Sequence, residues 1–372
     1  MMIPLEKAEA SQTLNRADLI SLLSLPEGEG SDRLFAAARK RRDELLGQKV
    51  YLRGLVELSN VCVKNCYYCG IRRDNHNVRR YTMSEEEILS GMVRAWRMGL
   101  GSAVLQSGER SDPAFVSMIE RVLRRIVSVT GGELGITLSL GEQSEETYRL
   151  WHEAGARRYL LRIEEADPAL YARLHPVDHS WSERMKCLRL LQKCGYQTGT
   201  GVMCGLPGQT LGHLADDLLF MKEFDTDMIG MGPYLPNPDT PLSSRFPDFE
   251  EKRTDLLFLA LKMIACARLL MPDVNIASTT ALQTLRPDGR ELGLLAGANV
   301  IMPNMGDGSR KKEYSLYTGK SDLADTPETV LARLTAAVKS TGCVIALHES
   351  GDPRHFFTRT VARSGLRSPS GD

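Results

Sequence analysis

The sequence predicts an α/β fold in which eight parallel strands, alternating with helices, close into a TIM-type (β/α)8 barrel. Eight short apolar runs alternate with longer amphipathic stretches over residues 51–302. The connections between these runs are long crossovers, which suit only parallel neighbours and favour a barrel over an open sheet. The 372 residues leave room for a barrel of roughly 250 residues with an extension at each end.

Apolar runs define the strands, and apolar residues at helical spacing define the helices. The predicted strands span residues 51–58, 103–106, 134–140, 158–161, 198–203, 228–231, 275–277 and 300–302. The predicted helices between them span residues 85–98, 113–129, 145–154, 181–194, 211–223, 252–270 and 291–296. Chemistry in such a barrel takes place at the carboxyl ends of the strands, where the informative polar residues of this chain fall.

The regions outside the barrel are predicted to be short. Residues 1–50 form an N-terminal helical extension around a turn at 26–30 that contains proline and glycine. We assign the barrel itself to residues 51–323. Residues 324–372 form a C-terminal tail with one helix at 327–339 and a polar, frayed end at 365–372.

The composition narrows the range of partners. The 47 Lys and Arg residues balance 47 Asp and Glu residues, which argues against nucleic acid or an anionic membrane and favours small molecules or a protein partner. No stretch reaches the roughly 18 apolar residues of a membrane span, and residues 1–10 lack an apolar signal core, so we expect a cytoplasmic protein. The eight cysteines are too sparse for a disulfide scaffold, and reduced thiols are expected.

Three of these cysteines, Cys62, Cys66 and Cys69, form a C-x3-C-x2-C motif after the first predicted strand. A loop with this spacing places three thiolates around one face of an iron-sulfur cubane and leaves the fourth iron without a protein ligand. Structural zinc would need a fourth ligand close by, and the nearest histidine, His76, lies seven residues beyond the motif. Three cysteines that occur together by chance are also disfavoured, because free thiols this close together in an exposed loop would be readily oxidised.

The motif, its place after the first strand, and Tyr68 directly before its last cysteine resemble the radical S-adenosylmethionine (SAM) superfamily. The resemblance implies that Cys62, Cys66 and Cys69 hold a 4Fe-4S cluster whose open iron chelates SAM. It also implies one-electron cleavage of SAM to a 5′-deoxyadenosyl radical.

Other strand ends suit such a cofactor. The run Gln106-Ser107-Gly108-Glu109 offers acceptors to the ammonium group of SAM and a glycine that permits close backbone approach. Arg184, early in a helix, and Arg162, at a strand end, are candidate partners for the carboxylate. Glu164 is a candidate acceptor for the ribose hydroxyls.

A closer resemblance, in order over about residues 50–320, is to the HydE family of FeFe-hydrogenase maturases. It rests on the runs at 59–75, 105–109, 137–142, 205–210, 236–241 and 298–304. The family implies a complete barrel enclosing a cavity, with the cluster and SAM at its top. It implies a small organometallic substrate, an iron-carbonyl-cyanide cysteine complex used to assemble the hydrogenase di-iron subcluster. The other hydrogenase maturases and an electron donor are the expected partners.

The family motifs also imply residue roles. The residues implied to bind or line the SAM site are Ser139, Glu164, Arg184 and Met203. The residues implied to face the substrate cavity are Arg53, Thr279, Thr280 and Tyr314. Arg53 lies on an otherwise apolar strand, where an inward guanidinium needs an anion or a carboxylate.

Two features depart from the family pattern. Some members carry a second cysteine cluster near the C-terminus, whereas this chain has only Cys343 after Lys320, so we expect no second cluster. The fourth strand ends Arg162-Ile163-Glu164-Glu165, where histidine and threonine are expected around the glutamate. The second departure concerns the identity of the substrate more than the radical chemistry.

Two alternatives stay open at this point. The first is a related radical enzyme, either a biotin-synthase-like sulfur inserter or a methylornithine-synthase-like mutase. A sulfur inserter would need further strand-end cysteines and an arginine for a sacrificial cluster, and only Cys204 stands at a strand end. The second is a non-catalytic iron-sulfur scaffold, which would not need the acidic and basic residues at the strand ends.

Overall fold

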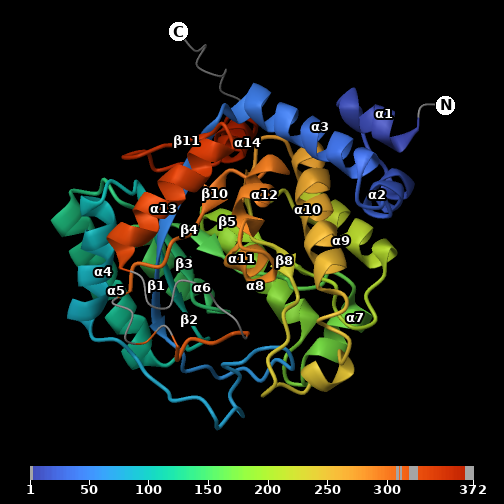
Figure 1. Cartoon of the computed structure of the whole chain (residues 1–372). Helices are drawn as coiled ribbons and strands as arrows, with labels where there is room; N and C mark the ends of the chain where they lie inside the picture. The colour runs from blue at the N-terminus through green and yellow to red at the C-terminus, as the bar shows by residue number, and fades with distance from the viewer. Residues whose placement is uncertain (1–2, 307–309, 311, 318–325, 365–372) are drawn as a thin grey trace.

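A computed structural model of the chain describes residues 3–306, 310, 312–317 and 326–364. Parallel strands succeed one another in chain order around a barrel (Figure 1). The strands are β1 (Lys49–Ser59), β2 (Ser102–Ser107), β3 (Gly135–Ser139), β4 (Ala156–Leu160), β5 (Gln197–Thr200), β7 (Met228–Ile229), β9 (Asn275–Ile276) and β10 (Val300–Ile301). The last strand, β10, pairs with the first, β1. A bridge between Ala277 and Val300 joins the ends of β9 and β10, and Ser278 N donates to Val300 O at 2.8 Å.

The predicted (β/α)8 barrel is confirmed, and each predicted strand overlaps an observed one. The predicted strand at 198–203 is divided, because its second part, β6 (Met203–Cys204), pairs instead with β8 (Gly232–Pro233). At the division, the segment between β5 and β6 lies very close to the segment between β7 and β8, so a Cβ on Gly201 would collide with the backbone of Gly230.

Local sequence signals explain where many of the helices begin. A Ser, Thr or Asp residue precedes each of several helices, and its side chain accepts a backbone N–H from the first turn. The helices capped in this way are α4 (Glu85–Arg97), α5 (Pro113–Thr130), α6 (Glu145–Glu153), α7 (Pro168–Leu174), α8 (Trp181–Lys193), α9 (Leu211–Glu223) and α13 (Pro327–Ser340). Two further predicted helices correspond to α10 (Arg253–Leu270) and α12 (Gly289–Leu295). Two helices, α7 and α11 (Thr280–Leu285), are not predicted from the sequence, because they are too short to show a helical period.

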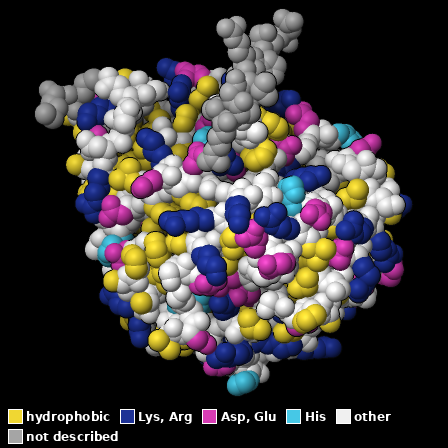
Figure 2. Space-filling model, turned by 180° about the vertical axis from the view of Figure 1, so that it is seen from behind, with side chains coloured by type: hydrophobic (Ala, Val, Ile, Leu, Met, Phe, Trp, Pro, Cys, Tyr) yellow, Lys and Arg dark blue, Asp and Glu magenta, His cyan; other side chains and the backbone are white. Residues whose placement is uncertain are grey.

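The N-terminal helices lie outside the barrel. They are α1 (Pro4–Glu9), α2 (Arg16–Leu23) and α3 (Glu29–Leu46). Contacts of α2 with α9 and of α3 with α10 hold them against the outer helices (Figure 1). Figure 2 shows basic and acidic side chains interspersed over one face, in keeping with the balanced charge. Among the described helices, none is long and apolar enough to cross a membrane.

The C-terminal region contains more structure than the single predicted helix. After α13, the short strand β11 (Val344–Ile345) pairs with β1, and a second helix, α14 (Arg354–Ser364), follows. The segment between them closes the floor of the barrel, where Gly351 O accepts hydrogen bonds from Arg53 and Asn275. The predicted boundary at 323/324 and the predicted frayed end at 365–372 lie outside the described residues.

Candidate active site at the top of the barrel

A cavity of about 320 Å³ lies at the carboxyl ends of the barrel strands, where the fold places catalytic residues. Its wall is built from the cysteine loop, from the ends of several strands and from residues 316–317. The residues singled out from the sequence that line it are Cys66, Tyr68, Cys69, Gln106, Arg162, Glu164, Arg184, Met203, Thr279 and Thr280. The structure therefore brings together residues that are up to 214 positions apart in the chain, from Cys66 to Thr280.

The cysteine loop packs tightly against the end of β2. The Glu109 N–H lies 3.3 Å from Cys62 Sγ and donates to it. A Cβ on Gly108 would lie 2.8 Å from the Cβ of Cys62, so glycine is required for this close approach. Burial raises the pKa of all three thiols of the motif, that of Cys69 to about 12. Buried thiols of this kind become thiolates when a metal binds them, which suits the donor set of an iron-sulfur cluster.

Glu164 stands on the cavity wall in an unusual backbone conformation. Its φ of 69° lies in the left-handed region, which a residue with a side chain seldom adopts. Two backbone hydrogen bonds hold it there: its N–H donates to Gly201 O at 3.0 Å, and its carbonyl accepts from Met203 N at 3.1 Å. Strain of this kind concentrates at functional sites and persists where the surroundings impose it.

Several residues of the cavity wall carry a buried polar atom with no hydrogen-bond partner among the described residues. These atoms include Arg162 Nε, Glu164 Oε2 and Thr279 Oγ1. Glu164 Oε2 lies 2.9 Å from Arg162 Nη2, an ion pair whose angles are not those of a hydrogen bond. Buried polar groups in proteins are nearly always satisfied, so this wall fits a polar ligand.

Arg184 on α8 is buried and held on three sides. Its Nε donates to Glu142 Oε1 at 2.6 Å, its Nη1 donates to the carbonyl of Arg162, and its Nη2 contacts His179 Nε2 at 3.0 Å. Although burial raises the pKa of Glu142, contacts with His179, Arg184 and Lys64 hold it well below its usual value. Because a guanidinium has five N–H donors, Arg184 keeps donors for a ligand carboxylate in the cavity.

Several predicted SAM contacts stand behind the wall instead of on it. Ser107 Oγ donates to Gly108 O at 2.6 Å. Glu109 accepts from Glu142 N at 2.9 Å and pairs with Lys64 at 3.3 Å, so its carboxylate fixes the neighbouring loops. Cys62 and Ser139 are likewise absent from the described lining of the cavity.

The predicted substrate residues are also separated from one another. Tyr314 is buried behind the wall, where its hydroxyl accepts from Gln106 Nε2 at 3.3 Å and so supports the Gln106 side chain. Thr279 and Thr280 line the cavity, next to the start of α11.

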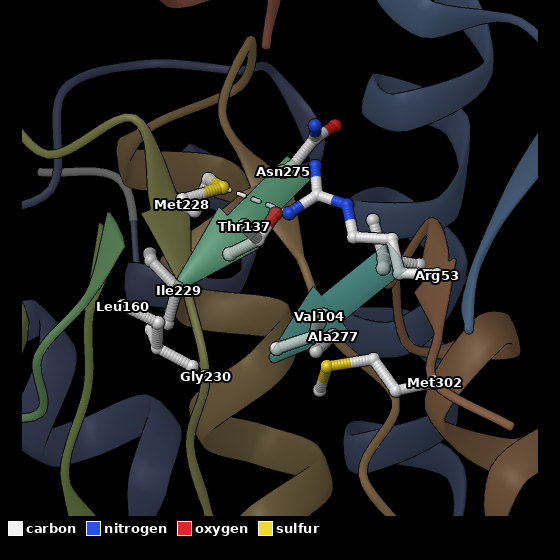
Figure 3. A pocket seen from close by; sticks show the side chains of 11 residues that line it. Arg53, Val104, Thr137, Leu160, Met228, Ile229, Gly230, Asn275, Ala277 and Met302 are labelled. Carbon is white, nitrogen blue, oxygen red and sulfur yellow. Dashed lines mark hydrogen bonds between the residues drawn. The ribbon is translucent and has the colours of Figure 1, made fainter. Parts of the chain in front are cut away.

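Arg53 lies at the opposite end of the barrel from the cysteine loop. It borders a separate interior cavity of about 20 Å³, where it points toward Met228 and Asn275 (Figure 3). Its Nη1 donates to Met228 Sδ at 2.8 Å, and its Nη2 donates to Gly351 O at 3.2 Å. Burial lowers the pKa of this guanidinium to about 9. Met302 borders both cavities.

Two histidines next to the cysteine loop were not singled out from the sequence. His179 Nδ1 lies 3.5 Å from Cys66 Sγ, and His175 Nε2 lies 3.0 Å from the Tyr68 hydroxyl. The ligand atoms of Cys66, His175 and His179 all lie within 4.8 Å of one another. The signal in the sequence was a pair of histidines four residues apart, shortly before Arg184.

Comparison with known proteins agrees with this site. The family model described as the radical SAM superfamily matches residues 56–221, the segment that carries the cysteine motif, Glu164 and Arg184. The chain belongs to this superfamily and is a radical SAM enzyme.

Similar proteins show which family within the superfamily the chain belongs to. The chain is 46% identical over 317 residues to the FeFe hydrogenase maturase subunit HydE of Thermotoga maritima, a match that covers 85% of this chain and 87% of the relative. This match shows that the chain belongs to the HydE family. It is also 31% identical to the 3-methylornithine synthase of Methanosarcina barkeri, over 80% of this chain and 81% of that protein. The crystal structure of methylornithine synthase (PylB) has a TM-score of 0.80 at 27% identity, over 93% of this chain and 98% of that one.

Proposed function

We propose that this chain matures FeFe-hydrogenase by radical SAM chemistry, with a 4Fe-4S cluster on Cys62, Cys66 and Cys69 and with SAM in the upper cavity. The proposal rests on one observation: the cysteine loop borders a cavity whose wall contains buried polar atoms without hydrogen-bond partners. When bound, the cluster supplies the electron that cleaves SAM to a 5′-deoxyadenosyl radical. The identity of 46% to a HydE subunit supports the hydrogenase pathway.

The residues of the cavity wall bind and orient SAM. Arg184 donates to its carboxylate, because it is the buried guanidinium next to Cys66 and keeps unused N–H groups. Glu164 accepts from the ribose hydroxyls, since its Oε2 has no hydrogen-bond partner among the described residues. Gln106, held by Tyr314, offers an amide to the polar end of the ligand. Closed barrel walls keep water away from the reacting atoms.

The substrate in this proposal is a small iron-carbonyl-cyanide cysteine complex. A cavity of about 320 Å³ suits small molecules and excludes a folded peptide or a nucleic acid. Thr279 contributes an unpartnered hydroxyl to the wall, with Thr280 beside it. Arg53 adds positive charge at the floor of the barrel, where it borders the second cavity. The other hydrogenase maturases and a one-electron donor are the partners in this proposal.

Deletion and complementation of the gene test the pathway. The deletion strain is expected to accumulate hydrogenase polypeptide that lacks its di-iron subcluster and has no activity, and the wild-type gene is expected to restore both. A Cys66→Ala gene is the matched control and should not complement. Normal hydrogenase activity in the deletion strain would remove the maturase assignment. Formation of 3-methylornithine by the purified enzyme would favour the mutase alternative instead.

A further inference from the structure

We propose that His179 donates a hydrogen bond from Nδ1 to the sulfur of Cys66 and thereby raises the reduction potential of the cluster bound there. The inference rests on the proposed function, because it takes Cys66 as a cluster ligand. It adds a tuning residue that neither the cysteine motif nor the cavity lining contains. His179 lies in the loop between α7 and α8, next to the cysteine loop in space but 113 residues away in sequence.

The position of His179 is well defined by its surroundings. Its side chain is buried, and the ring packs edge-on against the rings of His175 and Tyr171, with centroids 4.4 Å and 5.9 Å away. Nδ1 faces Cys66 Sγ at 3.5 Å, within the range of a hydrogen bond to sulfur. A ring held in this way cannot turn its donor away without disturbing its neighbours.

The hydrogen bonds on the other side of the ring decide which nitrogen carries the proton. Arg184 Nη2 lies 3.0 Å from His179 Nε2. A guanidinium can only donate, and the acceptor Glu142 Oε1 lies farther from Nε2, at 3.6 Å, which is beyond hydrogen-bond distance. Nε2 therefore accepts from Arg184, and the proton of the neutral ring is on Nδ1. If the ring were doubly protonated, Nδ1 would still carry a proton. In both forms, therefore, the N–H group points at the sulfur of Cys66.

The donor is anchored through Arg184 to two further charged residues. Arg184 Nε donates to Glu142 Oε1 at 2.6 Å, and Lys64 Nζ donates to Glu142 Oε2 at 2.7 Å. Because Arg184 also lines the cavity, the same guanidinium that orients His179 is positioned to meet the SAM carboxylate. Hydrogen bonds to a metal ligand from residues behind it orient that ligand and tune its metal centre.

The effect on the cluster has a defined sign. A hydrogen bond to a thiolate ligand withdraws negative charge, and it stabilises the reduced cluster more than the oxidised one because the reduced cluster carries one more negative charge. Hydrogen bonds to cluster sulfurs are among the terms that set these potentials. Loss of the donor should therefore lower the potential and make the cluster harder to reduce.

His175 provides a matched control in the same group of rings. Its Nδ1 lies 2.8 Å from the Tyr171 carbonyl, which can only accept, so that nitrogen carries the proton. Its Nε2 then accepts from the Tyr68 hydroxyl at 3.0 Å. Both ring nitrogens are thus occupied away from Cys66, although the ring is as deeply buried as that of His179.

Redox titration of the reconstituted, SAM-free holoenzyme, followed by electron paramagnetic resonance, tests the proposal. His179→Leu is expected to lower the equilibrium constant for one-electron reduction about tenfold, which is a shift of about 59 mV to lower potential. His179→Asn, whose amide nitrogen can take the place of Nδ1, and His175→Leu are expected to stay close to wild type. An unchanged potential in a His179→Leu protein with full iron content would overturn the proposal.

A second measurement needs no substitution at this position. In wild-type protein made with 15N-histidine, electron-nuclear double resonance on the reduced cluster should detect one weakly coupled ring nitrogen and one exchangeable proton. Absence of both couplings, or a strong coupling that indicates direct ligation by nitrogen, would overturn the hydrogen bond. A protein that binds no cluster at all would instead refute the proposed function on which this inference rests.

Discussion

Substitutions at Glu164 should separate backbone strain from ligand binding. The left-handed conformation of this residue, with φ of 69°, costs a residue with a side chain about 1–2 kcal/mol. Glycine removes that cost but loses about 0.5–1 kcal/mol to its greater freedom in the unfolded chain. Glu164→Gly and Glu164→Ala lose the same ion pair to Arg162, so this contribution cancels between them. We therefore expect the glycine variant to be more stable than the alanine variant by about 0.5–1 kcal/mol.

Binding should respond differently from stability. Both variants lack the carboxylate, whose charge-assisted hydrogen bonds to SAM are worth about 1.5–3 kcal/mol, or a factor of about 10–150 in affinity. Anaerobic urea denaturation measures the first difference, and calorimetric titration of the reconstituted proteins with SAM measures the second. A glycine variant less stable than the alanine variant would refute the role of strain. Wild-type affinity in both variants would refute the role of Glu164 in binding.

Three further predictions concern the cluster, the cavity and the C-terminal helix. Anaerobic reconstitution should give about four irons per chain, and Cys66→Ala should abolish this, whereas eight irons in the wild type would reveal a second site. Arg184→Ala should retain iron but weaken SAM binding by a factor of about 10–150, and unchanged affinity would remove Arg184 from the site. Hydrogen bonds to Asp273 and Asp225 raise the pKa of His355 from 6.5 to about 9. The protonated ring therefore contributes about 3 kcal/mol at most to the free energy of unfolding. This contribution is complete below pH 6.5 and is lost as the pH rises through 9. Urea denaturation should accordingly find His355→Ala less stable than wild type at pH 6 but equal to it at pH 10, and a pH-independent difference would contradict this.

The sequence by itself determined the architecture and the kind of chemistry. Alternation of apolar runs and amphipathic stretches is a local signal, and it recurs around the whole barrel, so errors of a few residues at single boundaries did not alter the fold class. The cysteine motif is equally local, because its three thiols lie within eight residues. Polar residues at strand ends could be assigned to one face since parallel strands bring their carboxyl ends to the same rim.

Only the tertiary structure decided which of those polar residues face the cavity and what stands behind them. Arg53 and Glu109 had the right chemistry, but Arg53 lies at the barrel floor and Glu109 is held by Lys64. His179 was overlooked because its partner, Cys66, lies 113 residues away, and periodicity carries no information about such contacts. The direction of a side chain and the packing of distant loops depend on the whole closed barrel, and a local pattern therefore cannot specify them.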